Sequence, residues 1–128
     1  MFQVKVTVAN PADSQQSFTD AFWVDTGALY TFVPEERLQA IGLQPKFARD
    51  FVLADGRRDR RLVGEASLTI DGLNETITCL VVFAPPGSLL LLGATALENF
   101  GVEADPANQR LRPITAVIGT VLASRPRA

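Results

Sequence analysis

The first segment of the chain alternates apolar and polar residues with a period of two. Its apolar members lie at every second position, at Phe2, Val4, Val6 and Val8. This period is typical of a strand that is buried on one face only. Turn-forming residues follow at 10–14, and a second apolar segment spans 17–24. The pattern therefore predicts that the chain starts with a β-hairpin.

A short strand and a helix are predicted next. Residues 29–33 form another apolar segment, which ends at Pro34. Proline suits the first turn of a helix, and the carboxylates of Glu35 and Glu36 face the positive end of the helix dipole. We expect one or two helical turns, which end at Gly42.

The middle of the chain predicts a second hairpin. Residues 47–54 and 57–70 have the composition of strands, and Asp55-Gly56 between them is a strong signal for a tight turn. Another strand is predicted over 76–83.

The last third begins with a continuous apolar run. Residues 89–92 are all leucine, which predicts a strand buried on both faces. A brief helix ending at Gly101 and two short strands within 102–113 follow. We therefore predict one mostly β domain over residues 1–113, with one or two short helices. Residues 114–128 are predicted to be a C-terminal extension.

Composition narrows the possible functions. The 128 residues are 47% hydrophobic and 20% charged, and the net charge is -2. This balance favours a packed globular domain and argues against a nucleic-acid binder. No segment has the roughly 18 consecutive apolar residues of a membrane helix, and the N-terminus does not resemble a signal peptide. We therefore expect no nucleic acid and no membrane among the partners.

The absence of histidine restricts the chemistry further. Without His there is no Ser-His or Cys-His nucleophile pair and no His-ligated zinc. Cys79 is the single cysteine, so it cannot form an internal disulfide, which fits a reducing compartment. We expect neither a metal nor a cofactor, and we expect a cytoplasmic location.

One motif carries candidate chemistry. Asp25-Thr26-Gly27-Ala28 places a carboxylate directly after an apolar strand. By itself the motif is also compatible with an ordinary β-turn, in which Asp accepts a backbone hydrogen bond and Gly supplies flexibility. The surrounding segments decide between these interpretations.

The order of these segments resembles the retropepsin-like aspartic proteases, the retroviral type, and most closely their small cellular and bacterial relatives. The specific parts of the resemblance are Asp25-Thr26-Gly27-Ala28 and Leu91-Leu92-Gly93-Ala94. In that family the first motif is the active-site loop, a central hairpin forms a flap, and an apolar-apolar-Gly segment crosses beneath the loop before a short helix. The resemblance covers roughly residues 1–113.

The resemblance implies a closed β-barrel with the acid-protease fold that hydrolyses peptide or protein substrates. It assigns catalytic roles to Asp25, Thr26 and Gly27. Thr26 is expected to hydrogen-bond across the dyad, and Gly27 to let the backbone approach the substrate. The expected substrate-binding residues lie in the loop and at the tip of the flap, at Ala28, Ala54, Asp55 and Gly56.

The chemistry requires two carboxylates that share one proton, and the aspartic-protease dyad is itself the standard example of this arrangement. Only one Asp-Thr-Gly occurs in the chain, and no Asp-Ser-Gly. Catalysis therefore requires two copies of the chain. We predict an obligate C2 homodimer in which the Asp25 side chains of the two subunits meet on the axis.

The sequence departs from the retroviral pattern in the loop and after it. Leu29 and Tyr30 stand where retroviral enzymes carry acidic residues that bind substrate backbone, and Thr95 lies in the region where they carry an arginine. The ion pair that supports the retroviral dimer is thus absent. We expect the apolar extension 114–128 to pair with the other subunit instead. Two alternatives remain open: a peptide-binding or partner-binding module with little turnover, and a structural β-domain in which Asp-Thr-Gly is only a turn.

Overall fold

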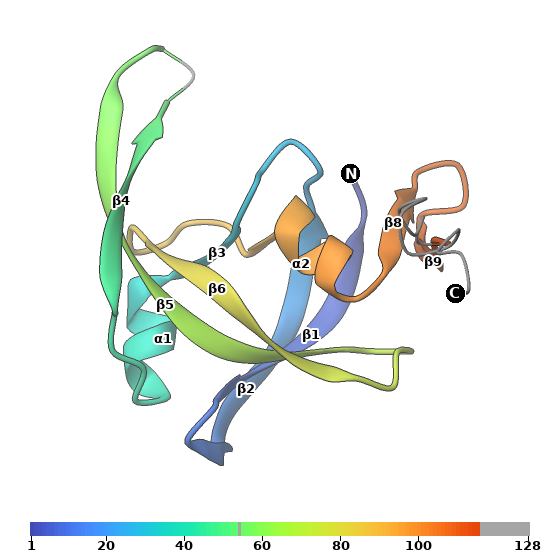
Figure 1. The fold of residues 1–128 in the computed structure, drawn as a ribbon, viewed down its shortest axis with the longest axis horizontal. Coiled ribbons are helices and arrows are strands. Elements are labelled where there is room, and N and C mark those ends of the chain that lie inside the picture. The colour runs from blue at the N-terminus through green and yellow to red at the C-terminus, as the bar shows by residue number, and fades with distance from the viewer. Residues whose placement is uncertain (54, 116–128) are drawn as a thin grey trace, which may run out of the picture.

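The chain begins with the predicted hairpin, formed by β1 (Gln3–Asn10) and β2 (Asp13–Val24). These residues belong to a computed structural model that describes residues 1–53 and 55–115 (Figure 1). The two strands pair antiparallel, with Val4 opposite Phe22. Alternation buries Val6 and Val8 completely, as the period of two predicted.

The strands close into a ring. Its order is β1, β2, β7 (Leu91–Leu92), β3 (Thr31–Pro34), β6 (Thr76–Ala84) and β5 (Arg58–Ile70), and a pairing between β5 and β1 completes it. The expectation of a mostly β domain with one or two short helices is confirmed, with two helices present. Of the closed β-barrel expected from the resemblance, the structure shows a closed ring of strands.

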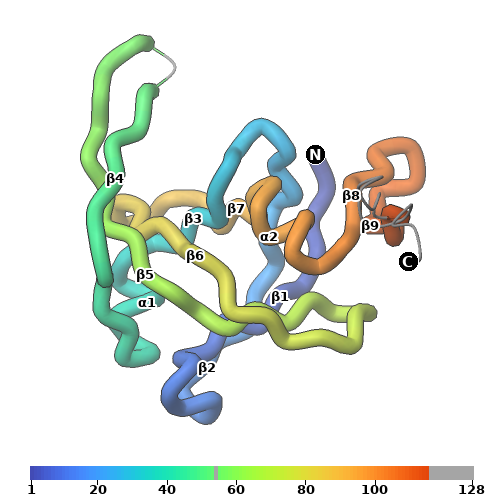
Figure 2. Tube along the Cα trace, in the orientation of Figure 1, coloured from blue at the N-terminus to red at the C-terminus, as the bar shows by residue number. Residues whose placement is uncertain are grey.

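The predicted hairpin around Asp55-Gly56 is also present. Strand β4 (Phe47–Val52) pairs antiparallel with the first half of β5 and lies outside the ring. Together they form an arm that extends well away from the ring (Figures 1 and 2). Gly56 takes a φ of +86°, the left-handed region that glycine tolerates without strain.

Two short helices and a small second sheet complete the fold. Helix α1 (Glu35–Ala40) follows β3, and α2 (Ala94–Asn99) follows β7. Strands β8 (Val102–Asp105) and β9 (Arg110–Pro113) form a hairpin of their own, and the backbone N–H of Ile114 still donates to the carbonyl of Gly101 at 2.9 Å. Within the described ranges, no helix has the length and apolar character needed to cross a membrane.

The core fills the ring and reaches α1 and α2. Its fully buried members come from strands that are distant in sequence and from α1, and they include Val6, Phe22, Leu38, Leu68, Val81 and Leu92. Burial of such side chains supplies the main free energy for closing the ring.

The leucine run at 89–92 differs from the prediction. Only Leu91 and Leu92 form a strand, and Leu89 is 61% exposed. Strand β7 lies between β2 and β3, pairs with β2 only at Leu91 and Leu92, and pairs with β3 at a single residue, Phe32. The proposed extension lies outside the described residues from position 116 onward.

Candidate active site

The Asp25 loop connects β2 to β3 and is held by backbone hydrogen bonds. The Asp25 N–H donates to the carbonyl of Leu92 at 3.0 Å, which ties the end of β2 to β7. The loop then turns, because the Ala28 N–H donates to the Asp25 carbonyl at 3.2 Å and the Gly27 N–H donates to Asp25 Oδ1 at 3.0 Å. The half-buried Asp25 carboxylate is thus fixed by its own loop, with its second oxygen left for another partner.

The start of α2 clamps the same loop from below. The N–H groups of Ala94 and Thr95 donate to the carbonyls of Ala28 and Leu29, at 2.8 and 2.9 Å. The loop carbonyls are therefore satisfied by α2, and the loop is anchored to a segment more than sixty residues away.

Gly93 makes this clamp possible. A Cβ at position 93 would stand 2.2 Å from the Tyr30 carbonyl oxygen, so only glycine allows this approach. The Gly93 N–H donates to the hydroxyl of the buried Thr31 at 3.2 Å. The predicted crossing of Leu91-Leu92-Gly93-Ala94 beneath the loop is thus present.

Asp25 and Thr26 face a small hollow of about 150 Å³ that opens beside the loop. Apolar side chains of the N-terminus, β2 and the β8–β9 hairpin form the remainder of its lining: Met1, Phe2, Val24, Ala104 and Pro106. The described lining contains no second carboxylate. Thr26 is exposed, and its hydroxyl has no hydrogen-bond partner among residues 1–53 and 55–115.

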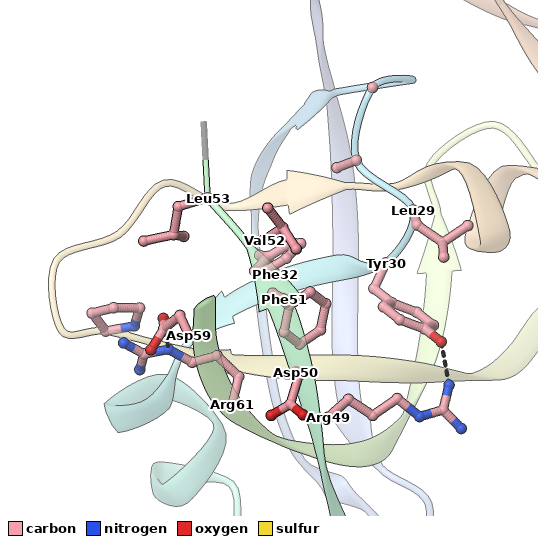
Figure 3. A pocket seen from close by; sticks show the side chains of 13 residues that line it. Leu29, Tyr30, Phe32, Arg49, Asp50, Phe51, Val52, Leu53, Asp59 and Arg61 are labelled. Atoms are coloured by element: carbon pink, nitrogen blue, oxygen red, sulfur yellow. Dashed lines mark hydrogen bonds and ion pairs between the residues drawn. The ribbon is translucent and has the colours of Figure 1, made fainter. Parts of the chain in front are cut away.

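A larger cavity of about 620 Å³ lies between the Asp25 loop and the hairpin arm (Figure 3). Its lining comes from the loop, from β3, from both strands of the arm and from the turn after β6: Gly27, Ala28, Leu29, Tyr30, Phe32, Arg49, Asp50, Phe51, Val52, Leu53, Asp59, Arg61 and Pro85. This size and this mostly apolar wall suit a small-molecule or peptide side-chain site.

The structure brings some of the predicted site residues together and separates others. Gly27 and Ala28 line the large cavity, whereas Asp55 and Gly56 lie at the tip of the arm and do not line it. Ala54 lies outside the described residues. The part of the arm that borders the cavity is its middle and outer part, at residues 49–53, 59 and 61. The pairs at its base, Phe47 with Val63 and Ala48 with Leu62, do not line the cavity.

Aromatic rings form the floor of this cavity. Phe51 of β4 packs edge-on against Tyr30 of the loop and Phe32 of β3, with ring centroids 5.9 and 5.8 Å apart. The Arg49 guanidinium donates to the Tyr30 hydroxyl (Figure 3). These contacts hold the middle of the arm against the active-site loop.

Most arginines of the arm are paired with acidic side chains of the arm itself. Arg60 contacts Asp50 at 3.1 Å, and Arg61 contacts Asp59 at 2.8 Å. At the tip, the N–H and the guanidinium of Arg57 both bind Asp55, and these hydrogen bonds hold the pKa of the Asp55 carboxyl below its ordinary value. The arm therefore carries less free positive charge than its sequence implies.

Sequence reasoning did not single out Tyr30, Arg49 or Phe51 as site residues. Residues 49, 51 and 53 share one face of a strand by alternation, and this is the signal that could have grouped Arg49 with Phe51. It gave no indication that this face lies over the Asp25 loop. In the described part of the chain, no group of three or more acidic or cysteine side chains is placed to hold a metal ion.

Comparison with known families gives one result. A family model described as aspartyl protease matches residues 4–96, a range that contains the Asp25 loop, the hairpin arm and the Gly93 clamp. Comparison with curated proteins gives no match.

Proposed function

Because the chain belongs to the aspartyl protease family, we propose that it is a homodimeric aspartic endopeptidase that hydrolyses peptide bonds with a water activated by two Asp25 carboxylates. The observation that carries this proposal is the position of the Asp25 loop, which is clamped by Gly93 and α2 and borders a 620 Å³ cavity roofed by the hairpin arm.

The need for a second copy follows from the count of carboxylates. Asp25 is the one acidic residue in the described lining of its hollow, and residues 116–128 contain no Asp or Glu. A dyad therefore needs Asp25 of another subunit, related by a twofold axis that passes beside the loop. The apolar hollow next to Asp25 and Thr26 then lies at the axis, where a second copy covers it.

The proposed chemistry uses one proton on the pair. Two adjacent carboxylates cannot both be ionised, so one is protonated and the other is not. The ionised carboxylate accepts a proton from the bound water, whose oxygen attacks the scissile carbonyl carbon. The protonated carboxyl donates its proton to the carbonyl oxygen. Collapse of the resulting tetrahedral intermediate breaks the C–N bond. The amine leaves with the proton that the first carboxylate took from water, and the second carboxylate takes back a proton from a hydroxyl of the intermediate, which restores the singly protonated dyad.

The large cavity is proposed to receive a side chain of the peptide substrate. Gly27 and Ala28 border both the Asp25 turn and this cavity, so a peptide lying over the loop can place its reacting carbonyl near Asp25 and a neighbouring side chain among Tyr30, Phe32 and Phe51. The arm would act as the flap over that peptide. For Asp55 and Gly56, contact with the substrate requires the tip to close over the loop.

The proposal is tested by digestion of a peptide library at several pH values, with wild type and Asp25→Asn in parallel. We expect cleavage by the wild type alone, inhibition by a statine-type compound, and a dimer by sedimentation for both proteins. Cleavage by Asp25→Asn at a rate close to that of the wild type would overturn the mechanism. Peptide binding without any cleavage by the wild type would identify a binding module with the same fold.

The compartment is a further part of the proposal. Cys79 is a free, buried thiol, and burial raises its pKa above the ordinary value. A lone thiol of this kind supports work in a reducing compartment such as the cytoplasm.

A further inference from the structure

One arginine of the large cavity is not neutralised by an acidic neighbour. The cavity wall contains two arginines and two aspartates. Asp50 is engaged by Arg60 and Asp59 by Arg61. Among residues 1–53 and 55–115, Arg49 has no carboxylate within ion-pair distance. The wall therefore presents one unbalanced positive charge, at Arg49.

The Arg49 guanidinium is also held in place. It lies 4.8 Å from the ring centroid of Phe47 and 5.6 Å from that of Tyr30, and it donates one hydrogen bond to the Tyr30 hydroxyl. Contacts with aromatic rings and a hydroxyl restrict the rotamers of this long side chain without neutralising its charge. A ligand that binds here then loses less side-chain entropy than it would with a free arginine.

Within the described residues, most N–H donors of this guanidinium remain available. Arginine carries five N–H donors, and the Tyr30 hydroxyl uses one. The group that best matches the remaining planar fork is a carboxylate, which can accept two parallel hydrogen bonds. In Figure 3 the Arg49–Tyr30 pair and the Asp59–Arg61 pair stand on opposite sides of Phe51. The free charge is therefore next to the Asp25 loop, at the Tyr30 side of the cavity.

We propose that this site selects peptides that carry a Glu or Asp side chain for Arg49, next to a large apolar side chain that occupies the aromatic floor. The inference rests on the proposed function, because it assumes that a peptide lies over the Asp25 loop. To the proposed function it adds the class of peptide that the site selects. Arg49 is the specificity-determining residue, and Tyr30 is the residue that positions it.

The experiment measures binding separately from turnover. Short labelled peptides with a fixed central pair of apolar residues carry Glu, Gln or Lys at each flanking position in turn. Binding of each peptide to the 128-residue Asp25→Asn protein is measured by fluorescence anisotropy. Cleavage of each peptide is measured with the chain that retains Asp25. The same series is repeated with Arg49→Gln, Arg49→Glu and Tyr30→Phe. Arg58→Gln is the matched control, because Arg58 is an exposed arginine of the same arm that does not line the cavity.

We expect one flanking position at which Glu binds about two- to fivefold more tightly than Gln, the range for a partly exposed ion pair. Arg49→Gln should remove this preference, Arg49→Glu should shift it to Lys, and Tyr30→Phe should reduce it. The Arg58→Gln control should keep the preference for Glu. Added salt should weaken this preference in the protein that retains Arg49. A Glu preference that survives Arg49→Gln, or no preference at any position, overturns the inference. A preference seen in binding while the wild type cleaves nothing would overturn the protease mechanism and leave this inference standing.

Discussion

Gly93 and Tyr30 approach so closely that a Cβ on Gly93 would stand 2.2 Å from the Tyr30 carbonyl oxygen. This contact brings the first N–H groups of α2 under the carbonyls of Ala28 and Leu29. The shape of the Asp25 loop therefore depends on a glycine far away in the sequence.

Gly93→Ala should destabilise the fold and distort the loop. The added methyl group meets backbone atoms that cannot rotate away, and overpacking of this kind costs about 1–3 kcal/mol. Urea unfolding measures the loss, and peptide cleavage should fall with it. Gly72→Ala is the control, because Gly72 has a φ of +89° with nothing within 4 Å of its Cβ position. It should cost stability through backbone strain alone and leave cleavage unchanged. Equal cleavage by Gly93→Ala and wild type would contradict the role of the clamp.

Asp25→Asn should fold and dimerise normally and lose turnover. The amide keeps the size of the side chain and can still accept the Gly27 N–H, but it cannot accept a proton from water. Loss of acid–base catalysis reduces kcat by roughly 10²–10⁴-fold. Asp71→Asn removes an exposed carboxylate from a remote Asp-Gly turn and should keep full activity. Initial rates with a cleaved library peptide compare the three proteins.

Thr26→Ala should weaken the dimer and leave the stability of the monomer unchanged. The Thr26 hydroxyl is exposed and unpaired within the described chain, so its loss should leave monomer unfolding unchanged. In a dimer each hydroxyl is expected to bond across the axis. Each net hydrogen bond lost should weaken association by about 0.5–1.5 kcal/mol. Sedimentation equilibrium over a concentration series measures this change. An unchanged dimer constant would remove Thr26 from the interface.

Asp105 should make the fold sensitive to acid. The side-chain amide of Asn108 donates to its carboxylate at 2.9 Å, and this bond, with the Asn108 backbone N–H, holds the pKa of Asp105 below its ordinary value of 3.8. A lowered folded pKa means that the ionised form stabilises the native state above pH 3.8, and that this stability is lost as the pH falls through the folded pKa. Asp105→Asn should therefore reduce the fall in stability below pH 3.8. Thermal unfolding between pH 2 and 6, at buffer conditions matched for wild type and variant, tests this; parallel curves would contradict it.

Truncation tests the predicted role of the C-terminal extension. The Ile114 N–H binds the Gly101 carbonyl, so the cut is best placed after Thr115, which keeps that bond. We expect the shortened protein to fold and to dimerise more weakly, because an apolar segment that covers a partner is lost. Sedimentation and cleavage assays at low concentration provide the measurement. A truncated protein that remains dimeric and active would assign the interface to the other surfaces around Asp25.

The sequence by itself determined the strands and the turns of this protein. Alternation at Phe2–Val8 identified the first strand, and Asp55-Gly56 identified the turn of the arm, because side-chain direction and left-handed backbone are local properties. It also identified the family, since Asp25-Thr26-Gly27-Ala28 and Leu91-Leu92-Gly93-Ala94 are contiguous motifs. Leu89 shows the limit of local patterns: it continues an apolar run but is exposed, and only Leu91 and Leu92 of that run form a strand.

The tertiary structure decided which side chains share a site. Tyr30 and Arg49 belong to segments that are distant in the sequence, and neither segment by itself indicates the contact. The fold of the arm places both residues on one cavity with Phe51. The same is true of charge. The sequence shows four arginines within residues 57–61. The register of β4 with β5 pairs Arg60 with Asp50, and it leaves Arg49 without a carboxylate partner within the described chain. Composition fixes how many charges a chain carries. Which of them remain unpaired depends on contacts between distant segments, and these exist only once the ring has closed and the arm lies over the loop.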